Sequence, residues 1–101
     1  MSIDSATLQV SAQRLFPDQD LDEVLAELLL ERARRDLLKY RTMSSQFEAK
    51  YGEGFESFRQ RVLDSEPAYE EEQDYFDWEL ATTGVADMKE EIERLSTSPG
   101  P

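Results

Sequence analysis

Two long runs of residues at alternating steps of three and four positions constrain this 101-residue chain more than any other feature. Such steps place side chains along one stripe of an α-helix, and no proline interrupts either run. The sequence therefore predicts two long amphipathic helices, the first beginning near Asp20 and ending near Tyr51. The first seam consists of Ala26, Leu30, Ala33, Leu37, Tyr40, Ser44, Phe47 and Tyr51, and the second of Trp78, Ala81, Val85, Met88, Ile92 and Leu95.

The segment between the two seams predicts a short third helix. Gly52 suits the left-handed position that follows a helix, and "GFESFRQRVL" then carries apolar residues on one side before Pro67 interrupts the chain. Long helices joined in this way fold back on each other as an antiparallel hairpin. We expect a mainly all-α protein whose hairpin domain occupies residues 20–96, followed by a disordered tail at 97–101.

The first part of the chain has a different pattern. Over residues 6–16 apolar and polar residues alternate, with Leu8, Val10 and Ala12 pointing one way, which is typical of a half-buried β-strand. A single strand is not stable alone, so it would pair with a copy of itself or with another chain. We therefore expect residues 1–19 to form an N-terminal strand or a disordered arm.

Extra leucines widen the apolar stripe at residues 21–30 beyond a single seam. A helix that is apolar on several sides needs more than one packing partner, which predicts a homodimer formed through the hairpin. The residues expected in the core or dimer seam are Leu28, Leu30, Leu37, Tyr40, Phe47, Trp78, Val85, Met88, Ile92 and Leu95.

Composition excludes several classes of function. The chain has no cysteine and no histidine, which removes thiol nucleophiles, disulfides, the usual zinc sites and imidazole acid–base chemistry. It has neither a signal-peptide pattern nor a membrane-length apolar run, so we expect a cytosolic protein with no cofactor. The net charge is −12, concentrated after residue 52, which disfavours unassisted nucleic-acid binding and favours a basic protein partner.

The stretch "EEEQDYFDWE", residues 70–79, holds six carboxylates with three aromatic residues among them. Carboxylates at successive helical positions point around the helix and do not converge as metal ligands must, so the pattern does not favour a metal site. Acids in the first turn complement the helix dipole, which accounts for Glu70, Glu71 and Glu72. Asp74, Asp77 and Glu79 lie beyond that turn and need another explanation.

The aromatic residues of this stretch predict a docking surface. Trp78 lies on the seam and Tyr75 borders it, whereas Phe76 and Leu80 lie on nearly the opposite face. Apolar groups ringed by acids can anchor a basic protein surface, while packing of Phe76 beneath Phe55 and Phe58 is the structural alternative. The residues expected to bind a partner are Glu71, Asp74, Tyr75, Phe76, Asp77, Glu79 and Leu80.

Over roughly residues 28–95 the chain resembles small prokaryotic antitoxins of the TumA type. The matching positions are Phe47, Glu48, Lys50, Tyr51, Gly52, Phe55, Phe58, Asp74, Trp78 and Glu79. The resemblance implies a non-enzymatic protein that neutralises a small basic toxin, usually a ribonuclease, by covering its active surface. The N-terminal segment departs from the family's pattern.

Two other functions stay open from the sequence. One is a structural helical dimer or adaptor with no inhibitory role. The other is a transcriptional autorepressor that binds operator DNA through an N-terminal strand, as ribbon–helix–helix antitoxins do. Arg14 is the only basic residue before Arg32, which disfavours the second.

Overall fold

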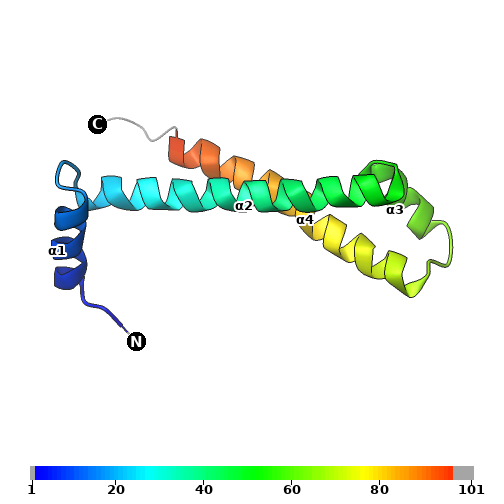
Figure 1. Cartoon of the computed structure of the whole chain (residues 1–101), viewed down its shortest axis with the longest axis horizontal. Coiled ribbons are helices and arrows are strands. Elements are labelled where there is room, and N and C mark those ends of the chain that lie inside the picture. The colour runs from blue at the N-terminus through cyan, green and yellow to red at the C-terminus, as the bar shows by residue number, and fades with distance from the viewer. Residues whose placement is uncertain (1, 97–101) are drawn as a thin grey trace.

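The computed structural model describes residues 2–96, which form an all-helical chain (Figure 1). The helices are α1 (Ser5–Leu15), α2 (Leu21–Tyr51), α3 (Phe55–Leu63) and α4 (Tyr69–Ser96). Helix α4 returns along α2 and crosses it, so the two make the predicted antiparallel hairpin, with α3 at its closed end (Figure 1). The predicted tail at 97–101 lies outside the described residues.

Local chemistry fixes both ends of α2. The side chain of Asp20 accepts a hydrogen bond from the Glu23 N–H at 2.8 Å, and the Glu23 carboxylate accepts one from the Asp20 N–H at 3.3 Å. This reciprocal capping box satisfies N–H groups that the first helical turn leaves unpaired. At the other end Gly52 adopts φ 67°, a left-handed conformation that costs glycine little and ends the helix.

The predicted N-terminal β-strand is wrong, because residues 5–15 are helical. Asp4 caps this helix by accepting a hydrogen bond from the Thr7 N–H at 2.8 Å. Leu8, Ala12 and Leu15 recur at i, i+4 and i+7, so the alternating pattern also fits one face of a helix. Helix formation satisfies the backbone within α1 itself, whereas a lone strand would need a partner. Helix α1 buries no residue and packs only across the beginning of α2 (Figure 1).

The core lies where α2, α3 and α4 meet. Phe58 and Trp78 are fully buried, and Val62 is 8% exposed. Four partly buried aromatic residues surround them, namely Phe47, Tyr51, Phe55 and Tyr75. The indole of Trp78 lies 5.1 Å from the Phe58 ring and 5.6 Å from the Phe47 ring, between centroids. Packing in this aromatic cluster holds α2, α3 and α4 together at the closed end of the hairpin.

Further along the hairpin the two seams face each other. Ala33 and Ala81 are buried, and Leu30, Leu37 and Tyr40 are partly buried. On α4, Val85, Met88, Ile92 and Leu95 are partly buried in the same way. Leu28, which the sequence placed in the core or dimer seam, is 44% exposed and does not belong to the core of the single chain.

Gly84 is buried in the middle of α4, where a glycine normally weakens a helix. A methyl group built on its Cα would lie 2.5 Å from Cδ2 of Tyr40 on α2. The absence of a side chain therefore allows the Tyr40 ring to lie directly against the α4 backbone.

The molecule is elongated. Its radius of gyration is 19.6 Å and its extents are 57 × 34 × 19 Å. A compact domain of about 100 residues has a radius of gyration of about 13 Å. Much apolar surface consequently stays exposed, including most of the leucines at the beginning of α2.

Candidate protein-binding surface

The acidic stretch of residues 70–79 forms the first third of α4, beside the aromatic cluster. Its carboxylates fall into two groups. Glu70, Glu71 and Asp74 are bound within the chain, whereas Glu72 and Asp77 make no hydrogen bond or ion pair with any residue between 2 and 96. Glu79 makes no direct hydrogen bond in that range, but its charge attracts the guanidinium of Arg59.

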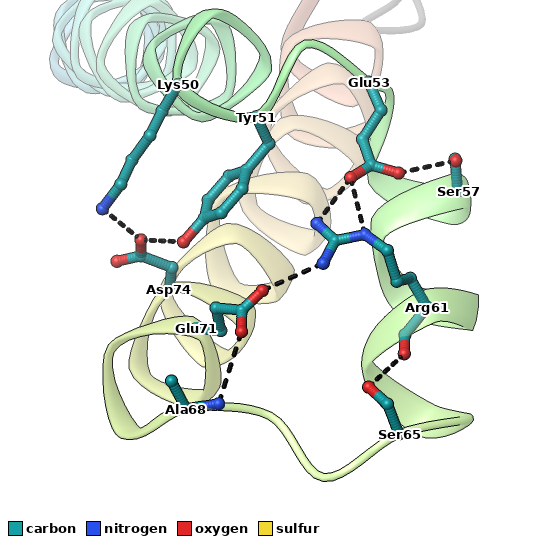
Figure 2. Close-up of polar contacts among 9 residues, drawn as sticks. All are labelled: Lys50, Tyr51, Glu53, Ser57, Arg61, Ser65, Ala68, Glu71 and Asp74. Carbon is teal, nitrogen blue, oxygen red and sulfur yellow. Dashed lines mark hydrogen bonds and ion pairs between the residues drawn. The ribbon is translucent and has the colours of Figure 1, made fainter.

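Asp74 joins α4 to the end of α2 (Figure 2). Its Oδ2 accepts a hydrogen bond from Nζ of Lys50 at 2.6 Å and another from the hydroxyl of Tyr51. Lys50 also pairs with Glu70, with 2.7 Å between Nζ and Oε1. Asp74, predicted as a partner-binding residue, is therefore occupied by contacts that hold the hairpin together.

The electrostatics of this contact follow from its geometry. Burial by itself would raise the pKa of Asp74, but the hydrogen bonds from Lys50 and Tyr51 outweigh it and hold the pKa below its usual value. Burial and the hydrogen bond to Asp74 raise the pKa of Tyr51 to about 12. The hydrogen bonds to Asp74 and Glu70 raise the pKa of Lys50, so the ion pair is charged at neutral pH.

Arg61 makes a second connection, between α3 and α4 (Figure 2). Its Nη2 lies 2.7 Å from Oε2 of Glu53, and its Nη1 lies 2.9 Å from Oε2 of Glu71. The other oxygen of Glu71 accepts a hydrogen bond from the Ala68 N–H at 3.3 Å, as expected for an acid in the third position of a helix. Glu71, the second acid predicted to bind a partner, thus fixes the start of α4.

The aromatic residues are also divided between core and surface. Trp78 is buried, and its indole N–H donates to Oγ of Ser44 at 3.1 Å. Tyr75 is half-buried and stacks on Phe55 with ring centroids 5.9 Å apart. Phe76, by contrast, is 54% exposed, and its ring meets that of Tyr75 edge to face with centroids 5.5 Å apart. It is not among the residues packed against Phe58, so the predicted alternative of Phe76 beneath Phe55 and Phe58 is not realised.

An exposed apolar stripe remains on α4, and we call it the α4 stripe: Tyr69, Phe76 and Leu80. These side chains are 79%, 54% and 57% exposed. Their spacing of seven and four positions places them on one face of the helix. Glu72 and Glu79 flank this face on one side and Asp77 on the other, and all three acids are exposed.

Of the predicted partner-binding residues, the structure therefore brings Phe76, Asp77, Glu79 and Leu80 together on the open surface. It places Glu71, Asp74 and Tyr75 in the contacts that close the hairpin. Tyr69 and Glu72 belong to the same surface, and sequence reasoning missed them as site residues. Extending the spacing of Phe76 and Leu80 back by one heptad would have found Tyr69.

Among residues 2–96, no three acidic side chains converge on a point where a metal ion would be held. None of the helices in that range has the length and apolarity that crossing a membrane requires.

No protein-family model, curated protein or solved structure matches this chain. Seven of the ten residues that carry the resemblance to TumA-type antitoxins lie at the closed end of the hairpin. Lys50, Tyr51 and Asp74 form one polar contact, while Phe47, Phe55, Phe58 and Trp78 form the aromatic cluster beside it. These positions therefore act first as the joint of the hairpin.

Proposed function

We propose that the protein is a non-enzymatic binding module that neutralises a small basic protein, as an antitoxin does, by covering that protein's active surface with the α4 stripe. The observation that carries the proposal is an exposed apolar stripe, Tyr69, Phe76 and Leu80, flanked by three exposed acids that form no direct ion pair within residues 2–96. In this role the protein acts in the cytosol, and its partner is a small toxin with ribonuclease activity.

Burial and charge give the stripe two separate tasks. Large apolar side chains supply most of the affinity of a protein interface when they become buried in it. Unpaired carboxylates around them attract a basic partner and speed its encounter. Because Glu72 and Asp77 have no ion pair within residues 2–96, a partner's lysines and arginines can reach them without displacing an existing contact, whereas at Glu79 they would share the charge with Arg59.

Rigidity also supports the proposal. The stripe begins within one turn of the contacts that Glu70, Glu71 and Asp74 make with α2 and α3. A binding surface that is already held in place loses less conformational entropy when a partner docks. The contacts of Glu70, Glu71 and Asp74 therefore hold in place the part of α4 that carries the exposed acids.

Of the two alternative functions, one conflicts with the fold and the other needs an experiment. An autorepressor that binds operator DNA through a β-ribbon lacks that ribbon, because residues 5–15 are helical. A structural dimer or adaptor without inhibitory activity is separated from the proposal by the following experiment.

The test is growth rescue in cells that express the product of the adjacent open reading frame. We expect that product alone to arrest growth and co-expression of this protein to restore it. Phe76→Ser/Leu80→Ser should abolish rescue, since the double substitution removes the apolar anchors from an exposed surface without touching the core. Leu38→Ser is the matched control, because Leu38 is 67% exposed on α2 and lies outside the stripe.

Two results would contradict the proposal. One is an adjacent gene product that does not arrest growth, which would favour the adaptor alternative. The other is full rescue by the α4 double variant at the same expression level as the wild type, which would show that the stripe is not the binding surface.

A further inference from the structure

A second apolar surface lies at the opposite end of the molecule from the aromatic cluster. Leu8 and Leu15 of α1 line a groove together with Leu21, Leu25 and Leu28 of α2. The wall of this groove is almost entirely apolar, and its other lining residues are Ser11, Ala12 and Phe16. The groove stays open because α1 packs only across the first turns of α2 (Figure 1).

The α2 side of this surface continues as a leucine face, which we define as Leu21, Leu25, Leu28 and Leu29. Its members recur at i, i+4, i+7 and i+8, so they share one face of the helix. Leu25, Leu28 and Leu29 are 49%, 44% and 55% exposed. Helix α4 covers a different face of α2, the one that carries Ala33 and Leu37.

Charge is distributed asymmetrically along the leucine face. Asp22 lies at its beginning, in the first turn of α2. Arg32 continues the same face one turn beyond Leu28, and its side chain is 70% exposed. Its Nε donates to both carboxylate oxygens of Asp36, at 3.2 and 3.3 Å, so the Nη groups are the ones that face a further acid. Along the helix the face therefore carries an acid first, then the leucines, and then the Arg32–Asp36 ion pair.

We propose that this surface binds a second copy of the chain, with the two α2 helices antiparallel across the leucine face. An antiparallel pair related by a twofold axis near residue 27 brings Asp22 of one copy to Arg32 of the other, and Leu25 opposite Leu29. Each contact then occurs twice, as an isologous interface requires. A parallel arrangement would instead place Asp22 beside Asp22 and Arg32 beside Arg32.

The self-complementary order of charges is the reason to prefer a second copy over another protein. The chain as a whole carries −12, so two copies repel each other unless the contact brings opposite charges together. The leucine face provides that arrangement, while the α4 stripe is flanked by acids only. The dimer surface and the α4 stripe are thus separate, and this inference does not depend on the proposed toxin partner.

The test is the molar mass in solution, measured by light scattering after size-exclusion chromatography. The chain mass is 11.7 kDa, and we expect the dimer at twice that value. Leu25→Asp/Leu29→Asp should elute as a monomer with an unchanged helical circular dichroism spectrum, since both side chains are already half exposed. Leu38→Asp should remain dimeric, because that exposed leucine lies on another face.

A charge exchange tests the antiparallel order. Asp22→Arg alone and Arg32→Asp alone should each raise the dimer dissociation constant at least tenfold, and the double exchange in one chain should restore it. A wild-type monomer at 100 µM, or a dimer that survives Leu25→Asp/Leu29→Asp, would overturn the proposal. Failure of the double exchange to restore affinity would overturn the antiparallel pairing.

Discussion

At the scale of single residues, Gly84 shows how one missing side chain sets the distance between two helices. Replacing it with alanine improves intrinsic helix propensity by about 1 kcal/mol, yet the new methyl group would lie 2.5 Å from the Tyr40 ring. Overpacking of this kind costs about 1–3 kcal/mol, and the contact involves ring carbons that cannot move without shifting the whole side chain.

We therefore expect Gly84→Ala to destabilise the protein despite its better helix propensity. Chemical denaturation monitored by circular dichroism measures the change, with Thr83→Ala as an exposed control on the same helix. In a Tyr40→Ala background the added Gly84→Ala should cost nothing further. Equal stability of Gly84→Ala and wild type would contradict the close packing of α2 on α4.

Asp74 makes a contact whose strength depends on pH. Its pKa is lowered in the folded state, so the carboxylate contributes stability above its unfolded pKa near 3.8 and loses that contribution as pH falls. Between pH 7 and pH 3 the wild-type melting temperature should consequently fall more steeply than that of Asp74→Asn. Asp77→Asn, which removes an exposed acid without an ion pair, should keep the wild-type slope. Parallel curves for wild type and Asp74→Asn would contradict the role of this carboxylate.

At the scale of helices, periodicity predicted the long elements well. Heptad steps identified the faces of α2 and α4 that meet, and Asp20, Glu23 and Gly52 marked the ends of α2 through known capping chemistry. These signals are local, so a sequence displays them directly.

Residues 5–15 show where such reasoning fails. An eleven-residue segment with Leu8, Val10, Ala12 and Leu15 satisfies period two and period 3.6 over part of its length, and the Asp4 cap decides for the helix. The sequence also did not predict the ion pairs of Lys50 and Arg61. These pairs join helices whose relative position depends on the path of the loops between them. For the same reason, nothing in the sequence separated the bound acid Asp74 from the open acid Asp77.

The seam of α2 can be tested with two neighbouring leucines. Leu37 is partly buried against α4, whereas Leu38 is 67% exposed. Leu37→Asp should unfold the protein or lower its melting temperature by more than 10 °C, because it places a charge in the apolar seam and a loss of 1 kcal/mol shifts a small domain by about 4–8 °C. Leu38→Asp should melt within a few degrees of wild type. Thermal melts followed by circular dichroism compare the two, and a native Leu37→Asp protein would show that the core lies elsewhere.

At the scale of the whole molecule, the elongated hairpin has a rigid joint and two uncovered apolar surfaces. The joint is the aromatic cluster with the contacts of Lys50 and Arg61, and the α4 stripe lies exposed beside it. The far end carries the leucine face and the α1 groove. We propose that both surfaces are covered in an assembly, with a copy of the chain at one end and a basic protein at the other.

The central claim is that the α4 stripe and its open acids capture a basic partner. The most direct measurement is the dissociation constant between the purified adjacent gene product and wild type, Phe76→Ser/Leu80→Ser, and Glu72→Gln/Asp77→Asn/Glu79→Gln, determined by titration calorimetry at 50 mM and 300 mM salt. We predict that the apolar double variant loses at least tenfold in affinity at both salt concentrations, and that the acid variant loses affinity mainly at low salt. Wild-type affinity for both variants at both salt concentrations would contradict the claim.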